Sequence, residues 1–256
     1  MNEKDAIVVT GIGVFSSIGC SRKSFWQSLV SGVSGVRKIS AFNPDGHKSR
    51  IASEVQSFNP TDYITLKLSR KMARVSQLAS SAADEAVKYA GLALEKESPN
   101  RVGCVIGSAA GDWYTIENQH LTFTQKGPGH LNPLSIPKII PNMPACNAAI
   151  VLGINGPNIG LATACATGAH SIGMALGILR QGQADVVLAG GAEATITPVV
   201  LDGYSSMRVL SNRNDEPQKA SRPFDLDRDG FVIGEGAGVL VLETFKHAKK
   251  RRAEML

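Results

Sequence analysis

The 256-residue sequence has few aromatic residues and only short apolar runs. Phe, Trp and Tyr make up 5% of it, so few side chains are available to stack on the bases of single-stranded nucleic acid, and we expect no nucleic-acid partner. The start carries Glu3 and Asp5 beside Lys4, and the apolar run that follows breaks at Gly11. That pattern fits neither a signal peptide nor a membrane span of roughly 20 residues. We therefore expect a cytoplasmic protein with no membrane contact.

Cysteines are also few. Cys20, Cys104, Cys146 and Cys165 are far apart and show no Cys-x-x-Cys spacing, and a chain of this length buries enough core without covalent links. We expect reduced thiols, and no metal site, because the histidines show no metal-ligand spacing either. The 27 Lys and Arg against 22 Asp and Glu give a net charge of +5. This small excess fits an acidic partner or a solvated surface.

Short apolar runs alternate with longer amphipathic segments. The runs predict strands covered on both faces, at 6–9, 102–106, 159–164, 186–189 and 239–242. Small and apolar residues at steps of three and four predict a helix from Met72 to Ala90, and a second helix spans 166–180. The proline-rich stretch 127–144 is predicted to be irregular, and 246–252 to be a charged helix. This order predicts a layered α/β fold in one domain, 1–256.

One motif begins like a dinucleotide-binding fingerprint. The run 11–13, Gly-Ile-Gly, follows an apolar strand, but the third glycine position holds Ser16. No acidic residue follows at the distance that would bind a ribose. We therefore do not interpret this run as a nucleotide site.

A second motif begins like a calcium loop. The acidic run 225–229 has aspartate at alternate positions, but the twelfth position of the loop holds Gly236 where a bidentate Glu is needed. We favour an acidic turn that pairs with Arg222 or Arg228.

The strongest chemical signal is the run 163–168, Thr-Ala-Cys-Ala-Thr-Gly, which follows an apolar run and begins a helix. A nucleophile on a strand-to-helix turn needs small neighbours so that the turn can close, and Cys165 lies between two alanines. The positive end of the helix dipole also favours a thiolate there. Cys165 is thus a candidate nucleophile; the alternative is a small buried hydrophobe. His170, five residues later, is expected to point away from the thiol.

Ten segments spread along nearly the whole chain carry a family resemblance. They are 8–14, 69–72, 103–107, 141–143, 156–157, 163–168, 189–193, 210–215, 221–225 and 229–238. These segments resemble those of the β-ketoacyl-acyl carrier protein synthases, most closely the type II elongating enzymes of fatty acid synthesis. The resemblance implies a thiolase-like layered α/β fold, of which this chain holds the first half and the start of the second. It also explains the two incomplete motifs as strand and turn segments.

The resemblance implies a reaction for Cys165. Its thiol takes an acyl group from carrier-bound phosphopantetheine as a thioester, and this group then condenses with the carbanion from decarboxylated malonyl carrier. The backbone amide of Cys165 would be one oxyanion donor. No cofactor of its own is implied, because the phosphopantetheine arm belongs to the carrier.

The resemblance also implies partners. Four basic residues match the face that docks the acidic acyl carrier protein: Lys67, Arg70, Lys71 and Arg208. A solvated helix face is the alternative for them. Ala110 stands where relatives often have a bulkier residue that gates the acyl pocket, and Gly129 and His130 replace a basic pair of some relatives. The family is usually a homodimer, to which the stretch 127–144 could contribute.

The two catalytic histidines of the family, its active-site lysine and its second oxyanion loop belong to a carboxy-terminal half that would follow Leu256, and His247 does not replace them. We therefore expect a truncated synthase that lacks the full active site. One alternative is a non-catalytic half-chain that binds acyl carrier protein or a synthase partner. Another is a cysteine hydrolase, which would need a histidine at the elbow.

Overall fold

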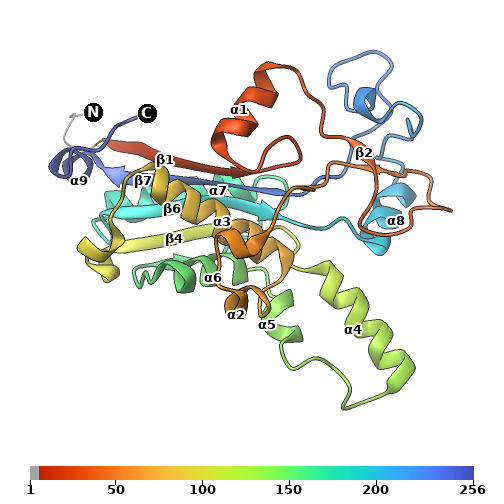
Figure 1. The fold of residues 1–256 in the computed structure, drawn as a ribbon, viewed down its shortest axis with the longest axis horizontal. Helices are drawn as coiled ribbons and strands as arrows, with labels where there is room; N and C mark the ends of the chain where they lie inside the picture. Colours follow the sequence, from red (N-terminus) through yellow and green to blue (C-terminus); the bar gives the residue numbers. More distant parts are fainter. Residues whose placement is uncertain (1–5) are drawn as a thin grey trace.

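A mixed five-stranded sheet forms the centre of the protein (Figure 1). The computed structural model describes residues 6–256, so the charged start that argues against a signal peptide lies outside it. The strand order is β1-β7-β6-β4-β5, in which β4, β5 and β6 are parallel and the β1–β7 and β7–β6 pairs are antiparallel. The strands are β1 Ile7–Phe15, β4 Val102–Gly107, β5 Asn158–Ile159, β6 Val186–Glu193 and β7 Gly236–Thr244, with β2 Arg37–Lys38 and β3 Ile51–Ala52 in a small separate sheet.

Helices cover both faces of the large sheet. Helices α3 and α6 pack on one face and α7 on the other. The helices are α1 Arg22–Val30, α2 Leu66–Ser69, α3 Arg74–Tyr89, α4 Trp113–Lys126, α5 Ser135–Ile139, α6 Met143–Leu152, α7 Thr167–Arg180, α8 Pro198–Ser206 and α9 Phe245–Lys250. The layered α/β fold that the sequence predicts is therefore confirmed.

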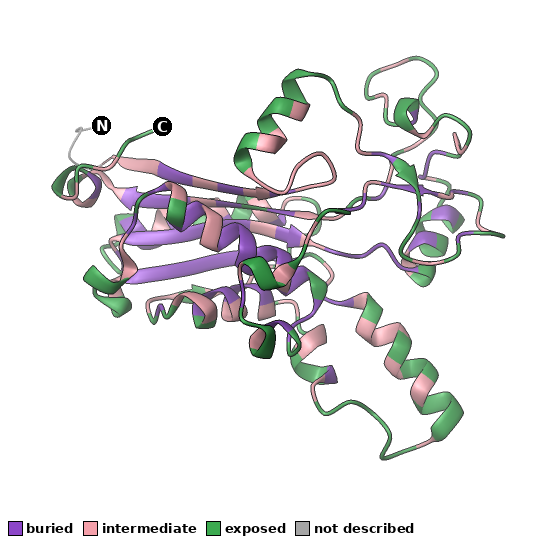
Figure 2. Cartoon of the chain, viewed as in Figure 1, coloured by how far each residue is buried: buried purple, intermediate pink, exposed green. Residues whose placement is uncertain are grey.

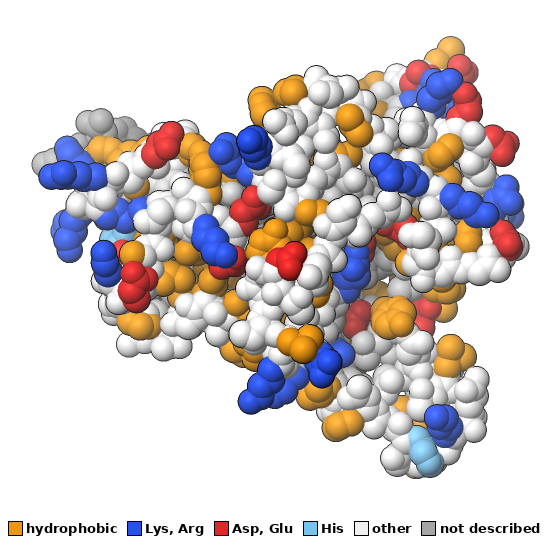
Figure 3. Space-filling model, in the orientation of Figure 1, with side chains coloured by type: hydrophobic (Ala, Val, Ile, Leu, Met, Phe, Trp, Pro, Cys, Tyr) orange, Lys and Arg blue, Asp and Glu red, His pale blue; other side chains and the backbone are white. Residues whose placement is uncertain are grey.

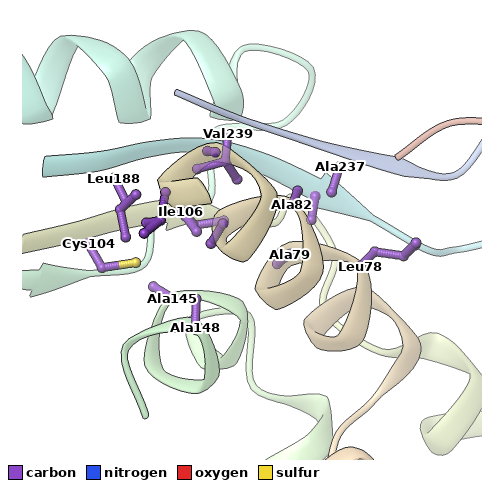
Figure 4. Close-up of a cluster of buried hydrophobic side chains, with 14 of the residues drawn as sticks. Leu78, Ala79, Ala82, Cys104, Ile106, Ala145, Ala148, Leu188, Ala237 and Val239 are labelled. Carbon is purple, nitrogen blue, oxygen red and sulfur yellow. The ribbon is translucent and has the colours of Figure 1, made fainter. Parts of the chain in front are cut away.

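Successive side chains of a strand point to opposite faces of the sheet, so the strands contribute to two hydrophobic cores. Cys104 and Ile106 of β4 face α3 and α6, whereas Val105 faces α7, and all three are buried. Figure 2 shows the central strands as the most buried part of the chain, and Figure 4 shows small side chains between α3, α6 and the sheet. Because Ala79 and Ala82 have only a methyl group, the helix axis lies close to the strands.

Gly11 and Gly13, the glycines of the dinucleotide-like run, allow α3 to pack closely against β1. Both lie inside β1, where a Cβ at Gly13 would be 1.9 Å from the carbonyl oxygen of Ala82, and one at Gly11 would be 2.3 Å from that of Ala86. The glycines thus allow the backbone of α3 to contact the strand directly. The interpretation as a strand segment is confirmed, and β1 extends to Phe15, well beyond the predicted 6–9.

Two predicted segments are wrong. Of the run 159–164 only Ile159 is in a strand, β5, because the chain then leaves the sheet edge, and residues 162–165 are exposed. The stretch 127–144 is not wholly irregular, since it contains α5 and the start of α6. The predicted helices at 72–90, 166–180 and 246–252 are confirmed as α3, α7 and α9.

The acidic turn pairs with Arg222 as expected, and also with Arg213, which was not predicted. Asp225 lies 3.5 Å from Nε of Arg222, and Asp229 lies 3.6 Å from Nε of Arg213. Within residues 6–256 no three metal-ligating side chains come together. The four cysteines are free thiols. No helix of the described chain has the length and apolar character needed to cross a bilayer.

A buried carboxylate joins α9 to the sheet at the end remote from Cys165. Glu243 is fully buried, and its oxygens accept hydrogen bonds from Arg251 at 2.5 Å, from His247 Nδ1 at 2.5 Å and from the Thr10 hydroxyl. Burial opposes ionisation, but these bonds outweigh it and lower the pKa of Glu243 to about 2. The hydrogen bond to Glu243 and a second one to Glu97 raise the pKa of His247, against the effect of burial.

We expect His247 to make stability depend on pH. Its folded-state pKa exceeds the ordinary value of 6.5, so its stabilising contribution is complete below that pH and is lost as the pH rises through the raised value. Urea titrations should show the free energy of unfolding falling as the pH rises above 6.5. A His247→Gln variant should lack this fall. The same pH dependence in both proteins would contradict the assignment.

Candidate functional site

Cys165 lies on a tight turn between β5 and α7. The residue before it, Ala164, has a left-handed backbone with φ of +50°. The hydroxyl of Thr167 closes the turn, because it donates to the carbonyl of Ala164 at 2.7 Å and accepts from the amide of Thr163 at 2.8 Å. Cys165 is exposed at the tip of this turn. The predicted elbow is therefore present, and the alternative of a buried hydrophobe is contradicted.

The first turn of α7 lies directly on the carboxyl ends of β4 and β6. A Cβ at Gly107 would be 2.2 Å from the Thr167 side chain, and one at Gly191 would be 3.1 Å from Cα of Gly168. Side chains at these strand ends would displace the helix. Because Gly107 and Gly191 have no side chains, α7 begins directly against the strand ends. Cys165, just before α7, therefore lies at the end of the sheet.

A cleft of about 690 Å³ opens beside Cys165. Ala109 and Ala110 line it from the loop after β4, Glu193 from the end of β6, and Phe231 from the segment before β7. The ring of Phe231 packs edge-on against Tyr204 at 5.3 Å. The structure thus brings Ala110, predicted to line an acyl pocket, into the same cleft as Cys165.

Glu193 is a residue of this cleft that the sequence analysis did not single out. Its carboxylate accepts a hydrogen bond from the Ser108 hydroxyl at 3.0 Å and from the Ala109 amide at 2.8 Å. Burial raises the pKa of Glu193, and the hydrogen bonds oppose that rise. An acidic residue at the end of an otherwise apolar strand is the signal that would have found it.

His170, the histidine nearest to Cys165 in the sequence, forms a hydrogen bond with Thr163. His170 Nδ1 lies 2.9 Å from the hydroxyl of Thr163, the first residue of the 163–168 turn. Within the described chain its hydrogen bond goes to Thr163 rather than to Sγ of Cys165. The cysteine–histidine pair that a hydrolase needs is not formed here.

The backbone amide of Cys165 is a possible hydrogen-bond donor to a ligand. The amides of Ala166 and Thr167 donate to the carbonyls of Thr163 and Ala164, at 3.2 and 3.1 Å. In residues 6–256 the amide of Cys165 makes no hydrogen bond to a backbone carbonyl. That amide therefore remains available to a ligand in the cleft.

The predicted carrier-docking residues fall into two groups. Lys67 lies in α2, and Arg70 and Lys71 follow directly after it; all three are exposed. Figure 3 shows one group of basic side chains low in the centre of the view, and others spread over the left and right of this face. Arg208 is exposed two residues after α8, which Figure 1 shows apart from α2. The structure thus brings three of the four together but not Arg208.

Comparisons with known proteins agree with this architecture. Residues 4–248 match the family model of the beta-ketoacyl synthase N-terminal domain. The chain belongs to the beta-ketoacyl synthase family. As in its relatives, the fold is thiolase-like: a beta-ketoacyl synthase from Burkholderia phymatum superposes with a TM-score of 0.88 at 32% identity, over 97% of this chain and 61% of that one.

Similar sequences and complexes are known within the family. The chain is 43% identical to 3-oxoacyl-[acyl-carrier-protein] synthase 2 of Vibrio cholerae and 41% identical to that of Staphylococcus aureus, over 98% and 100% of its length. It spans 61% of the length of these relatives. A type II polyketide ketosynthase solved with its acyl-carrier protein has a TM-score of 0.85 at 33% identity, over 97% of this chain and 60% of that one.

Thiol reactivity should follow exposure in this synthase-family chain. Cys165 is exposed, whereas Cys104 is buried and burial raises the pKa of its thiol to about 12. With iodoacetamide at pH 8, peptide masses should show Cys165 modified at least about 100-fold faster than Cys104. Cys165→Ser should remove the fast phase. Similar rates at the two positions would contradict the exposed elbow.

Proposed function

We propose that the protein performs the acyl-transfer step of a 3-oxoacyl-[acyl-carrier-protein] synthase in fatty acid elongation, with Cys165 as the nucleophile. The observation that carries the proposal is the exposed Cys165 on a left-handed elbow, at the start of α7 and beside a cleft. The name of the relatives at 43% and 41% identity supports the reaction class.

The local geometry supports the first half-reaction. The thiolate of Cys165 attacks the thioester carbonyl of the acyl carrier, a new S–C bond forms, and the carrier's C–S bond breaks as its thiol regains a proton. The negative charge on the carbonyl oxygen is stabilised by the available amide of Cys165. The phosphopantetheine arm arrives with the carrier, so this step uses no group bound permanently in the protein.

The second half-reaction belongs to the complete synthase. Loss of CO₂ from malonyl carrier leaves a carbanion, which attacks the acyl–Cys165 carbonyl and releases the thiolate. Groups that stabilise the enolate are needed for this step. The family places its histidines for it in the half beyond the stretch matched here, so condensation is proposed for the parent enzyme. The alternative, binding without catalysis, predicts carrier affinity with no acyl adduct.

Incubation with an acyl-carrier thioester should add one acyl group to the 27.0 kDa chain. Intact mass should detect this adduct, and Cys165→Ser should lose it while carrier binding remains. Cys146→Ser, which alters a half-buried thiol, is the control and should still be labelled. Equal labelling of the Cys165→Ser variant would exclude Cys165 as the nucleophile. Rapid release of free fatty acid by the unmodified protein would instead favour the hydrolase.

The acidic acyl carrier is proposed to dock on Lys67, Arg70 and Lys71. These exposed cations lie together at α2, and the known complex of a related ketosynthase with its carrier supports this kind of partner. Arg208 would contact the carrier only if the carrier extends towards α8. The positive net charge of +5 favours the same partner.

Charge reversal at the docking site should weaken carrier binding. We expect Arg70→Glu with Lys71→Glu to raise the Kd about tenfold at low ionic strength and less at high salt, because salt screens exposed charges. Lys249→Glu with Lys250→Glu makes the same net change on α9, at the remote end of the molecule, and should have little effect. Titration calorimetry at two salt concentrations measures both. A salt-independent loss would place the docking face elsewhere.

Ala110 is proposed to widen the acyl side of the cleft. Its methyl group lines the cleft that contains Cys165, so a bulkier side chain there would shorten the space for an acyl chain. The protein is accordingly proposed to accept longer or branched acyl groups than relatives with a bulky residue at this position.

The protein is also proposed to act as a homodimer in the cytoplasm. The short strand β5 lies at the edge of the sheet, and Leu131, Ile136 and Ile140 expose 44, 62 and 40% of their surface in the stretch 127–144. Such apolar exposure favours an interface. Sedimentation should give about twice 27.0 kDa; a monomer at micromolar concentration would contradict the proposal.

A further inference from the structure

The loop between β4 and α4 is held by a carboxylate that is distant in sequence. Ser108–Gly111 leaves the end of β4, and Glu193 ends the neighbouring strand β6. One oxygen of Glu193 accepts the Ser108 hydroxyl at 3.0 Å, and the other accepts the Ala109 amide at 2.8 Å. Two successive residues of the loop thus bind one side chain.

The same loop has little else to fix its position. The amide of Ser108 donates to Leu161 at 3.2 Å, and the Ser108 hydroxyl accepts the amide of Gly111 at 3.0 Å. Ser108 is buried, whereas Ala109 is exposed and Ala110 is half-buried. Since a hydrogen bond to a charged acceptor is stronger than one between neutral groups, Glu193 is the main restraint on the exposed part.

This restraint lies in the wall of the reactive cleft. Ala109, Ala110, Glu193 and Cys165 line the same 690 Å³ space. A chain attached to Cys165 would lie along Ala110, which directly follows the two residues that Glu193 binds, Ser108 and Ala109. A preformed wall binds an apolar chain better than a mobile one, because no ordering cost is incurred when the chain enters.

We propose that Glu193 is a positioning residue that fixes the Ser108–Gly111 loop and thereby sets the preference of Cys165 for acyl chain length. The role rests on the proposed acyl transfer for its biological meaning. Glu193 takes no part in bond making; it acts through the placement of Ala110.

The chain provides a matched control in Glu54. Its carboxylate also binds a serine and the next alanine, accepting the Ser40 amide at 3.0 Å, the Ser40 hydroxyl at 2.6 Å and the Ala41 amide at 2.9 Å. This group lines a separate cavity of about 740 Å³ that does not include Cys165. Glu54→Gln therefore removes the same kind of restraint at a different place.

The test compares alkylating reagents that differ only in chain length. Iodoacetamide and N-octyl iodoacetamide both alkylate Cys165 by displacement of iodide, and peptide mass spectrometry gives the rate at that residue. In Glu193→Gln the ratio of the octyl rate to the iodoacetamide rate should fall at least about threefold. Ser108→Ala, which removes one hydrogen-bond donor to Glu193, should also lower the ratio of the octyl rate to the iodoacetamide rate. Glu54→Gln should leave the ratio unchanged.

Hydrogen exchange provides a second measurement on the same proteins. The amides of Ala109 and Ala110 should exchange at least about fivefold faster in Glu193→Gln than in the unmodified protein. If Glu193→Gln does not fold, Ser108→Ala decides both measurements. An unchanged length ratio in the folded variants, or an equal change in Glu54→Gln, would overturn the proposal.

Thioesters separate this inference from the proposed function. Four- and eight-carbon acyl thioesters should acylate Cys165 with the same dependence on Glu193 as the alkylating reagents. If the unmodified protein is alkylated with length preference but never acylated, the proposed function fails and the role of Glu193 stands. If it is acylated with a preference that Glu193→Gln leaves intact, the proposed function stands and the role of Glu193 fails.

Discussion

The close approach of helix α7 to the carboxyl ends of β4 and β6 is the constraint on which the site depends. Backbone contacts backbone there, since Gly107, Gly168 and Gly191 have no side chains to separate the helix from the strands. This contact fixes the start of α7, and the left-handed turn at Ala164 then exposes Cys165. The exposed thiol of Cys165 is thus positioned by packing of α7 against the sheet.

Buried and half-buried carboxylates that accept several hydrogen bonds then fix the segments next to the sheet. Glu193 holds the loop after β4, and Glu243 holds α9 at the other end of the sheet. A third carboxylate, Glu235, binds Arg74 in a two-bonded pair at 2.7 and 2.8 Å and also accepts the amide of Val55. Because such groups are costly to bury unpaired, each is surrounded by donors. Of these three carboxylates, Glu193 lines the cleft beside Cys165, together with the glycine-rich ends of β4 and β6.

Local patterns in the sequence were enough to predict much of this arrangement. The apolar runs and the alanine stripe predict β4, β6 and α3 because each is covered along its length. The run 163–168 predicts the elbow because the hydrogen bonds that close its turn, from Thr167 to Ala164 and from Thr163 to Thr167, are local. By contrast, β5 ends after Ile159 because the chain turns away from the sheet edge, which composition alone does not encode. Glu193 was missed because Ser108 lies 85 residues away, and the separation of Arg208 from α2 is likewise a matter of tertiary structure.

The most direct test of this account is the free energy of unfolding of Gly107→Ala, measured with urea beside Gly173→Ala. Gly173 lies in α7 with no atom within 4 Å of an added Cβ, so alanine there should stabilise the protein by up to about 1 kcal/mol. At Gly107 the added methyl would meet Thr167 at 2.2 Å, and we predict a loss of about 2–3 kcal/mol. Equal free energies of unfolding for the two variants would show that the packing of α7 does not require a glycine at the end of β4.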